Sequence, residues 1–358
     1  MSAKSLRVGI VGCGTVAELR HIPALRYSRG AQIVAVCDAK EDLTESVAKK
    51  FNIRGHFADL TEMLKQEELN LVDICTPPRT HATLSIQAME AGCHVLVEKP
   101  MAMSCEEADK MIRASEKNRV KLCVVHNQLF QPAMMKAISM VSEGFIGDVT
   151  SVSIRDSRAR DNDQFMNKDH WIYKLPGGLF SEHLPHPIYL AEAFLGSLEP
   201  IAVYTRKLSS YDWVIADEVR AILEGEKGIA TITVSHSWPK VIGMLDVFGT
   251  RRNLHVNRYS SVLTTYGAGG DSRLWRALDN LSQSYQQTAC TALTAVKTVL
   301  GKHSTMHGTL IQRLIQAIRD DTQVPVTGEE GREVVRVLEK ITSQLRGVAG
   351  AMANQIEK

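Results

Sequence analysis

The sequence predicts an α/β Rossmann domain with a parallel sheet over residues 1–126. An α+β domain with a large open, mostly antiparallel sheet follows over residues 127–358. Three observations lead to this prediction. Short apolar runs alternate with helical patterns as far as residue 125, a glycine turn follows the first run, and β-branched runs with hairpin turns follow residue 126. A chain of 358 residues is long enough for two domains.

The composition is that of an ordinary globular protein, with 44% apolar and 23% charged residues. A formal net charge of +2 gives no reason to expect nucleic acid as a partner. Because no apolar run has the length of a membrane span or a signal peptide, we expect a cytoplasmic location. Seven cysteines without a C-x-x-C pair predict buried thiols and no metal site.

The N-terminal half alternates strands and helices in the way a parallel sheet requires. Its predicted strands are continuous apolar runs, which are typical of strands buried on both faces. These strands are 6–11, 33–37, 71–76, 94–97 and 120–125, and the helices are 16–27, 43–51, 61–64, 81–91 and 105–118.

The first strand runs directly into a turn with the pattern G-x-G-x-x-A, which opens the first helix. This is the context that a dinucleotide-binding fingerprint requires. Gly12 permits the tight turn, and Gly14 lets the backbone approach a pyrophosphate at the helix N-terminus. We therefore predict Gly12, Gly14, Thr15 and Val16 as cofactor-binding residues. The alternative is a glycine turn that serves packing alone.

Asp38 ends the second strand, 24 positions after Gly14. A carboxylate at that place bonds the adenosine ribose and repels a 2′-phosphate. The sequence therefore favours NAD(H) as cofactor, while Lys40 nearby leaves NADP(H) open.

Three later segments, together with the glycine turn, resemble the Gfo/Idh/MocA oxidoreductases over residues 8–345. They are T-P-P-R-T-H at 76–81, E-K-P at 98–100 and the segment 176–186. The resemblance implies that the cofactor cleft is lined by Thr76, Pro77, His81, Glu98 and Lys99.

The roles of Lys99 and His81 can also be interpreted from their own chemistry and position. An ammonium near a substrate hydroxyl would stabilise the alkoxide that develops as hydride leaves. The alternative for Lys99 is a solvated lysine at a strand end. His81 opens a predicted helix, where a histidine serves equally well as a surface or capping residue.

The second domain is predicted from consecutive strands at 149–154, 201–204, 218–223, 229–235, 244–248, 254–256 and 262–266. In the family that the chain resembles, one face of such a sheet covers the active site and the other often forms a subunit interface. The resemblance therefore implies a homodimer or a homotetramer.

The catalytic pair is expected in the segment 177–186, which is similar to the family pattern G-G-x-x-x-D-x-x-x-H. Glu182 and His186 stand four residues apart, so a helix would place both on one face, with the carboxylate orienting the imidazole for proton transfer. Pro185 disfavours helix at Leu184, which puts regular spacing in doubt. We predict Lys99, Glu182 and His186 as catalytic residues. Glu182, His183 and His186 could instead suggest a metal site, but no third firm ligand is visible among them, so we predict no metal.

Substrate contacts are expected from several residues of this domain. Leu129 stands where many relatives carry an arginine. Arg155, Arg158 and Arg160 could hold a phosphate or carboxylate in its place, although the aspartates between them favour an ion-pair network.

Two aromatic residues and two polar ones complete the candidate substrate contacts. Trp171 and Tyr173 could stack on a sugar face or fill the domain interface, and Asn127 and His183 are the polar candidates.

Residues 271–302 have apolar side chains at three- and four-residue steps, which predicts an amphipathic helix. We expect a helical insertion that packs on the sheet or on another subunit. The alternatives are a substrate lid or a membrane-surface contact through Arg273, Arg276 and Lys297. Closing helices are predicted at 307–319 and 329–345.

Together these features predict an NAD(P)-dependent oxidoreductase. It would transfer a hydride between nicotinamide and a secondary alcohol or ketone of a sugar, cyclitol or activated sugar. Two alternatives stay open: a non-catalytic dinucleotide-sensing regulator of the same fold, and an enzyme that cleaves or epimerises a glycoside by transient oxidation.

Overall fold

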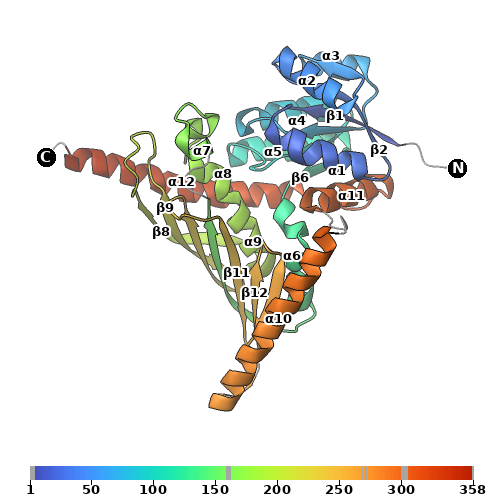
Figure 1. Cartoon of the computed structure of the whole chain (residues 1–358). Coiled ribbons are helices and arrows are strands. Elements are labelled where there is room, and N and C mark those ends of the chain that lie inside the picture. Colours follow the sequence, from blue (N-terminus) through green and yellow to red (C-terminus); the bar gives the residue numbers. More distant parts are fainter. Residues whose placement is uncertain (1–4, 159–162, 268, 271, 300–304, 357–358) are drawn as a thin grey trace. The chain divides into compact units, whose positions relative to one another are not determined.

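The computed structural model of the chain (Figure 1) describes residues 5–158, 163–267, 269–270, 272–299 and 305–356. It divides the chain into two compact units. The first unit is Met1–Asn127 with Ser304–Arg336, and the second unit is Gln128–His303 with Val337–Lys358.

The first unit is built on a six-stranded sheet in which every pair of neighbouring strands is parallel, in the order β3-β2-β1-β4-β5-β6. The strands are β1 Leu6–Val11, β2 Ala31–Cys37, β3 Gly55–Phe57, β4 Leu71–Ile74, β5 His94–Val97 and β6 Leu122–Val124. The helical segments are η1 Ala17–His21, α1 Ile22–Tyr27, α2 Glu41–Phe51, α3 Leu60–Gln66, η2 Pro78–Thr80, α4 His81–Glu90, α5 Cys105–Asn118 and α11 Met306–Arg319.

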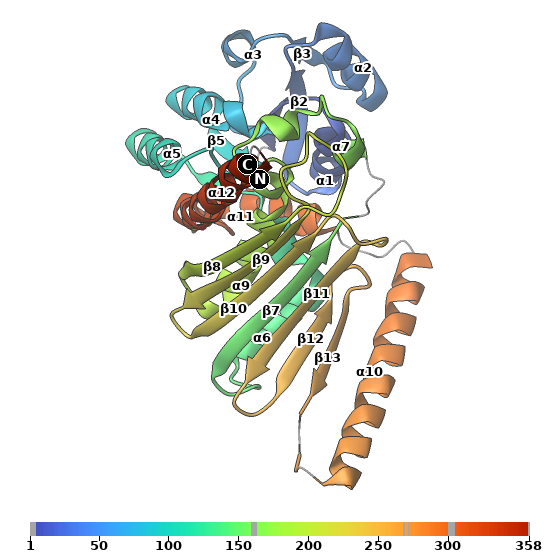
Figure 2. The ribbon, with the colours of Figure 1, turned by 90° about the vertical axis from the view of Figure 1, so that its left-hand side faces the viewer.

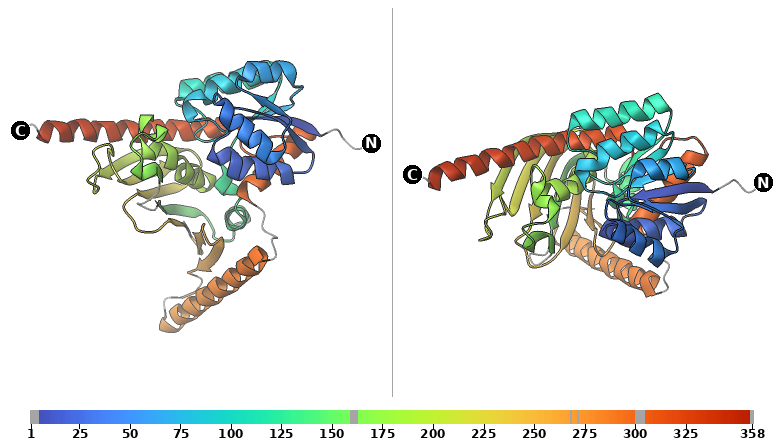
Figure 3. Two further views of the ribbon diagram at one scale, coloured as in Figure 1. Left: turned by 45° about the horizontal axis from the view of Figure 1, so that its top comes forward. Right: turned by 90° about the horizontal axis from the view of Figure 1, so that it is seen from above.

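The central strands are covered on both faces. All four residues of β4 and all three of β6 are buried, and successive side chains of a strand point to opposite faces. Helices α4 and α5 lie side by side, as Figure 3 shows, and α11 packs against α1. The sheet therefore has the doubly covered form that its continuous apolar runs predicted.

Short polar signals begin and end these helices. Asp59 caps α3 by accepting hydrogen bonds from the Thr61 and Glu62 N–H groups, and Ser104 caps α5 through the Glu107 N–H. Asn52 ends α2 in the left-handed conformation, with φ +51°.

The parallel strands end in line at one edge of this sheet. Val11 pairs with Cys37 on one side and with Ile74 on the other, and Ile74 pairs with Val97. The residues that follow these four strands therefore emerge side by side. The strand order reverses between β1 and β4, which is where open α/β sheets bind their ligands.

The second unit is built on a seven-stranded sheet in the order β13-β12-β11-β7-β10-β9-β8, antiparallel except for the pair β7–β10 (Figure 2). Its strands are β7 Val149–Ser157, β8 Leu198–Arg206, β9 Glu218–Gly225, β10 Gly228–Ser235, β11 Ile242–Gly249, β12 Asn253–Asn257 and β13 Val262–Tyr266. Its helical segments include α6 Pro132–Ser142, α7 Asp163–Met166, η4 Trp171–Lys174, α8 Leu179–His183, α9 Pro185–Leu195 and α10 Arg273–Val299. The short helix η3 Asn127–Phe130 leads into this unit, and helix α12 Gly328–Ile356 contributes to both units.

One face of this second sheet carries the core of the unit. Helix α9 packs on β7 and β10, and α6 packs on β12 and β13. Along β10, the side chains of Ala230, Ile232 and Val234 are buried, whereas Ile229 and Thr231 are exposed. This alternation is typical of an antiparallel sheet with one covered face.

Helix α10 runs beside β13 at the edge of the second sheet (Figure 2). Gln286 accepts a hydrogen bond from the Thr265 N–H at 2.8 Å, and Asp279 accepts one from the Gly267 N–H. The predicted packing on the sheet is confirmed, but a polar face of the helix makes these contacts. The apolar residues stay 45% to 75% exposed at Leu274, Leu278, Leu281 and Tyr285.

The predicted fold class is confirmed, and each predicted strand and helix is present. Their bounds agree within a few residues except in the last helix, α12, which extends to Ile356 rather than ending at 345. The short edge strand β3 was not predicted. The domain boundaries differ at the C-terminal end, because residues 304–336 pack with the first unit rather than within a domain 127–358. Ends of predicted segments at 271 and 300–302 lie outside the described residues.

The reassigned segment gives a test of this partition. A Cβ on Gly331, in the first turns of α12, would lie 2.6 Å from Val124 Cγ2 and 2.9 Å from Met101 Sδ. We expect Gly331→Val to lower the free energy of unfolding by about 1–3 kcal/mol, because the added methyl groups overpack β6. Chemical denaturation measures this change. The control Glu329→Val alters an exposed residue of the same turn, and an equal loss in both variants would contradict the packing argument.

Candidate active site

The glycine turn follows β1 at the edge where the parallel strands end. Gly12 has φ +94°, and a Cβ there would lie 2.8 Å from the backbone of Cys75 and Thr76, so only glycine fits. A Cβ on Gly14 would meet no atom within 4 Å. The Glu18 N–H bonds to the Gly14 carbonyl, which places the start of the first helix at this glycine. The turn thus combines one packed glycine with one open glycine at a helix N-terminus, as an anion cradle requires.

Asp38 lies directly beside this turn. Its Oδ2 accepts a hydrogen bond from the Cys13 N–H at 2.9 Å, and its Oδ1 accepts one from the Lys40 N–H at 3.0 Å. The carboxylate is half-buried, so it fixes the glycine turn and also stays accessible at the end of β2. This position fits a contact with the adenosine ribose of a dinucleotide.

The segment after β4 lies on the other side of the turn. Thr76 is half-buried and Pro77 is exposed, but His81 is completely buried. One ring nitrogen of His81 lies 2.9 Å from the Pro100 carbonyl oxygen and the other lies 2.7 Å from that of Thr76. Burial lowers the pKa of His81. This geometry corrects the expectation that His81 lines the cofactor cleft: the ring ties two loops together.

Glu98 and Lys99 follow β5 in the same row. Lys99 is half-buried, and its backbone N–H donates to Glu98 Oε2 at 3.0 Å. Glu98 is only 9% exposed, and its Oε1 lies 2.9 Å from His21 Nε2. Glu98 therefore faces the interior of the first unit and reaches Lys99 through the backbone.

His21 stands between two buried carboxylates. Its Nδ1 lies 2.8 Å from Asp73 Oδ2, and neither side chain is exposed. Burial disfavours a charged imidazole, but the negative charge of Asp73 outweighs it and raises the pKa of His21 well above its usual range. Burial would likewise raise the pKa of Glu98, but the hydrogen bond and charge of His21 lower it below its usual range. The three groups form a chain of alternating charge.

His307 of α11 closes this cluster. Its ring lies 5.3 Å from that of His21, and burial together with the charge of His21 lowers the pKa of His307 to about 4. Asn127 Nδ2 lies 3.2 Å from His307 Nε2, so the candidate substrate residue Asn127 packs against the cluster.

The ligand atoms of His21, Glu98 and His307 lie within 4.8 Å of one another, a spacing that also suits a metal ion. The sequence predicted no metal site and overlooked this cluster. Because His21 Nε2 lies at hydrogen-bond distance from Glu98, we interpret the group as a hydrogen-bonded cluster.

The second unit holds the predicted pair Glu182 and His186. Leu184 keeps helical backbone angles, φ −63° and ψ −30°, although Pro185 follows it. Pro185 occupies the first turn of α9, where its missing N–H costs nothing, so α8 continues almost directly into α9. The interruption expected from Pro185 is present, since Leu184 lies outside both helices, but it is one residue long and the backbone angles there stay helical. Glu182 is half-buried near the end of α8.

His186 is 7% exposed and meets a tyrosine one turn later in α9. Its Nδ1 lies 2.8 Å from Tyr189 Oη, and that oxygen accepts a hydrogen bond from the Gln128 N–H at 3.2 Å. Tyr189 thus holds the imidazole from the interior of the second unit. Sequence reasoning missed this tyrosine, although its i, i+3 spacing from His186 was a usable signal.

His183 and the two aromatic candidates have partners in the second unit. His183 Nδ1 lies 3.2 Å from Nε2 of His236, which burial keeps neutral at a pKa of about 3. Tyr173 donates its hydroxyl proton to the Phe165 carbonyl at 2.8 Å. Trp171 is half-buried with its ring 5.3 Å from that of His170.

Arg155, within β7, forms an ion pair, as the alternative of an ion-pair network predicts. Arg155 lies 3.3 Å from Asp246, and the buried Arg258 pairs with Asp156. Arg155 is therefore not an unpaired anion holder. Arg158 is half-buried, and its charge contributes to the low pKa of His236 after burial itself. Arg160 and the side chain of Lys297 lie outside the described residues.

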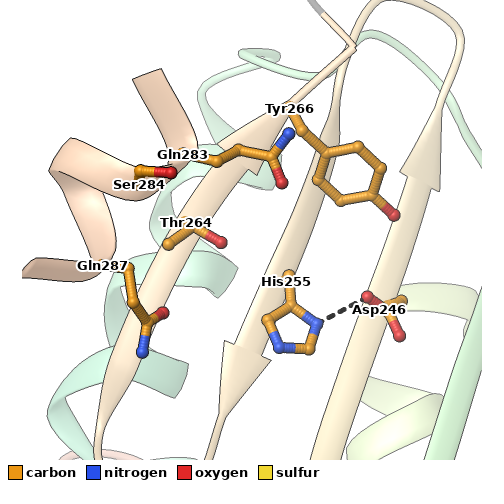
Figure 4. Close-up of a pocket in the computed structure, with 7 residues that line it drawn as sticks. All are labelled: Asp246, His255, Thr264, Tyr266, Gln283, Ser284 and Gln287. Carbon is orange, nitrogen blue, oxygen red and sulfur yellow. Dashed lines mark hydrogen bonds and ion pairs between the residues drawn. The ribbon is translucent and has the colours of Figure 1, made fainter. Parts of the chain in front are cut away.

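A polar cavity of about 470 Å³ lies between α10 and the second sheet (Figure 4). His255 Nδ1 lies 2.7 Å from Asp246 at its floor. None of the residues predicted from the sequence lines it; the lining residues are Asp246, His255, Thr264, Tyr266, Gln283, Ser284 and Gln287.

Sequence reasoning also missed Asp73 and His21. Asp73 interrupts an otherwise apolar strand that is buried on both faces, which is a signal that a carboxylate needs a buried partner. The partner was not predictable, because His21 is distant in sequence and reaches Asp73 from a π-helical turn, η1. Such turns insert one extra residue into a helix and redirect side chains.

Gly12 and Gly14 form a matched pair for a stability test. We expect Gly12→Ala to lower the free energy of unfolding by about 1–3 kcal/mol, because the new Cβ requires a strained φ and meets backbone at 2.8 Å. Gly14→Ala adds its Cβ in open space, and we expect little change. Thermal and chemical denaturation compare the two variants. A Gly14→Ala protein as destabilised as Gly12→Ala would refute this account of the turn.

Comparison with known proteins agrees with this geometry. Residues 6–126 match the Gfo/Idh/MocA oxidoreductase family model with an NAD-binding Rossmann fold, and residues 134–255 match the C-terminal domain model of the same family. In the described part of the chain, no helix is both long enough and apolar enough to cross a bilayer.

The sequence identity to individual relatives is low. The chain is 28% identical to Oxidoreductase P35 of Formosa agariphila over 54% of this chain and 61% of that protein. It is 29% identical to inositol 2-dehydrogenase of Rhizobium meliloti over 60% and 62% of the two chains, so these matches span about three fifths of each relative. The WlbA dehydrogenase of Bordetella pertussis, solved with NADH and UDP-GlcNAcA, shares the fold with a TM-score of 0.81 at 21% identity, over 97% of both chains. The chain belongs to the Gfo/Idh/MocA family of oxidoreductases, enzymes with an NAD-binding Rossmann fold.

Proposed function

We propose that the protein is an NAD(H)-dependent dehydrogenase for a secondary alcohol or ketone of a sugar, cyclitol or activated sugar. One observation carries the proposal: the strands β1, β2, β4 and β5 end in line. The glycine turn, Asp38, Thr76 and Lys99 therefore share one edge of the first sheet. The substrate class is supported by relatives named inositol 2-dehydrogenase and by the UDP-GlcNAcA in the WlbA dehydrogenase structure.

Three groups of the first unit would hold the dinucleotide. The backbone at Gly14, Thr15 and Val16 would receive the pyrophosphate, since Gly14 leaves open space beside the helix start. The Asp38 carboxylate would bond the ribose, and Thr76 with Pro77 would lie along the cofactor. Asp38 disfavours a 2′-phosphate, so NAD(H) fits better than NADP(H).

The chemistry would depend on the side chains of Lys99, His186 and Glu182. Bound NAD supplies the acceptor and donor of hydride. Lys99 would hold the substrate oxygen and stabilise negative charge on it, and His186 would take or return the hydroxyl proton. Tyr189 Oη accepts a hydrogen bond from the Gln128 N–H and can accept a second one from a protonated His186 Nδ1. Neutral His186 would then carry its proton on Nδ1 and keep Nε2 free to take the hydroxyl proton, with Glu182 as a carboxylate partner.

The experiment is a substrate panel with catalytic variants. Sugars, cyclitols and nucleotide-activated sugars are tested with NAD and NADP, and NADH is followed by absorbance. We expect NAD to give the higher kcat/KM, because Asp38 would repel a 2′-phosphate. Lys99→Met and His186→Asn should each lower kcat by about 100-fold or more, because each removes charge or proton transfer in the transition state.

The control is Lys65→Met, which neutralises an exposed lysine of α3 that makes no part of this edge. Normal turnover in His186→Asn would refute its role. Binding of NADH without turnover on any substrate would favour a dinucleotide-sensing regulator, and glycoside cleavage without net NADH would favour transient oxidation.

We also propose that the protein is a homo-oligomer that uses the outer stripe of α10. Leu274, Leu278, Leu281 and Tyr285 form one exposed apolar stripe of this helix, at 45% exposure or more. Contiguous apolar surface of this kind is typical of an association site. Its occupant would be a second copy of the chain, since the family resemblance implies a homodimer or homotetramer.

We expect the double variant Leu278→Glu with Leu281→Glu to reduce the mass measured by light scattering, because two charges would be buried at the interface. Gln287→Glu is the control, since it adds a charge on the opposite, sheet-facing side of α10. An unchanged mass in the double variant would exclude this stripe as the interface.

A further inference from the structure

The buried cluster beneath Lys99 has no part in the chemistry described so far. Asp73 on β4, His21 in the π-helical turn and Glu98 after β5 are linked by hydrogen bonds of 2.8 Å and 2.9 Å. The side chains of His21 and Asp73 are not exposed at all, and that of Glu98 is 11% exposed. Burying ionised groups is costly, so a fold that retains three of them obtains something other than packing.

The chain of contacts leads to the predicted catalytic lysine. Glu98 Oε1 faces His21, and Oε2 accepts the backbone N–H of Lys99. The two oxygens of one carboxylate thus connect the cluster to the turn that carries Lys99. The orientation of the Glu98 carboxylate therefore determines whether this hydrogen bond to the Lys99 N–H can form.

We propose that Asp73, His21 and Glu98 form a charged relay that positions Lys99 for catalysis, a role that rests on the function proposed above. Asp73 holds the proton on His21, and the resulting imidazolium keeps Glu98 ionised and fixed in orientation. The ionised carboxylate anchors the Lys99 backbone and supplies a counter-charge to its ammonium. Asp73, His21 and Glu98 are positioning residues, because they act through Lys99.

The electrostatic surroundings agree with this assignment. Above its folded pKa, Glu98 is a carboxylate; below the raised pKa of His21, the imidazole is charged. His307 is kept neutral by burial and by the charge of His21, so His21 is the cation of the pair. The other titratable or charged groups that interact with the cluster are Cys75 after β4, His81 of α4, Lys99, Cys123 of β6, His126 after β6 and Arg20 of η1.

The first measurement needs no substrate. A histidine whose pKa is raised by folding stabilises the protein fully below its unfolded value of about 6.5, and this contribution is lost as pH rises through the folded value. Glu98 adds stability above its unfolded value of about 4.3, which is lost as pH falls through its folded value. The stability difference between wild type and His21→Gln should therefore be largest between about pH 4.5 and 6.5 and should decline at higher pH.

The His21 ring can also be observed directly. In protein labelled with ¹³C-histidine, the NMR signal missing from His21→Gln belongs to His21, and it should still be that of an imidazolium at pH 7, above the ordinary pKa of histidine. In Asp73→Asn the same ring should titrate at lower pH. A His21 signal that is neutral at pH 7 in the wild type would overturn the relay.

The second measurement is kinetic. In wild type, His21 keeps Glu98 ionised at low pH; without His21, burial raises the pKa of Glu98. His21→Gln should therefore move the acid limb of the kcat profile upward by at least one pH unit and lower kcat by about 10- to 100-fold, because Lys99 is displaced. Glu98→Gln retains an acceptor for the Lys99 N–H but carries no charge. Its kcat should therefore be low, and the pH profile of kcat should lack the acid limb.

The matched control is His94→Gln, which makes the same change to a half-buried histidine at the opposite end of β5. It should leave the kcat profile unchanged. If His21→Gln is destabilised but keeps the wild-type profile, the cluster is structural and the relay fails. If wild-type protein binds no NADH and oxidises no substrate, the proposed function fails instead, whatever His21 shows by NMR.

Discussion

The alignment of four parallel strand ends is the constraint on which the first unit depends. Backbone hydrogen bonds between β2, β1, β4 and β5 place Cys37, Val11, Ile74 and Val97 in one row. Three backbone hydrogen bonds continue the ladder one residue further. They run from the Gly12 N–H to the Cys37 carbonyl, from the Cys75 N–H to the Val11 carbonyl and from the Glu98 N–H to the Ile74 carbonyl. Groups separated by up to 87 residues therefore meet without any long loop, from Gly12 to Lys99. A register slip of one residue would turn this row of side chains to the wrong face.

Charge burial is the second constraint, and it follows from the first. A sheet covered on both faces leaves no water for Asp73 in β4 and little for Glu98 at the end of β5. The π-helical turn supplies His21 as their common partner, with one ring nitrogen for each carboxylate. The π-helical turn and the aspartate within an apolar strand thus belong together. The turn places His21 against Asp73, and Asp73 in turn holds the buried His21.

The second unit differs from the first, because its sheet is covered on one face only. Helices α6 and α9 cover that face, while α10 protects the β13 edge by polar contacts through Asp279 and Gln286. An edge strand covered in this way cannot pair with another chain through its backbone. The same arrangement turns the apolar stripe of α10 outward, away from the sheet.

The sequence by itself determined the element order, the parallel and antiparallel sheets and the glycine turn. These features depend on local signals: apolar runs, turn residues and periodicity. It also identified Lys99 and His186 as residues worth testing. Only the tertiary structure decided which partners they have. His81 is drawn inward, His186 meets Tyr189, and His21 joins Asp73 to Glu98 across 52 and 77 positions of sequence. Likewise, periodicity defined the amphipathic α10 but not which of its faces meets the sheet. Burial and hydrogen bonding between distant segments decide such contacts, and no local pattern encodes them.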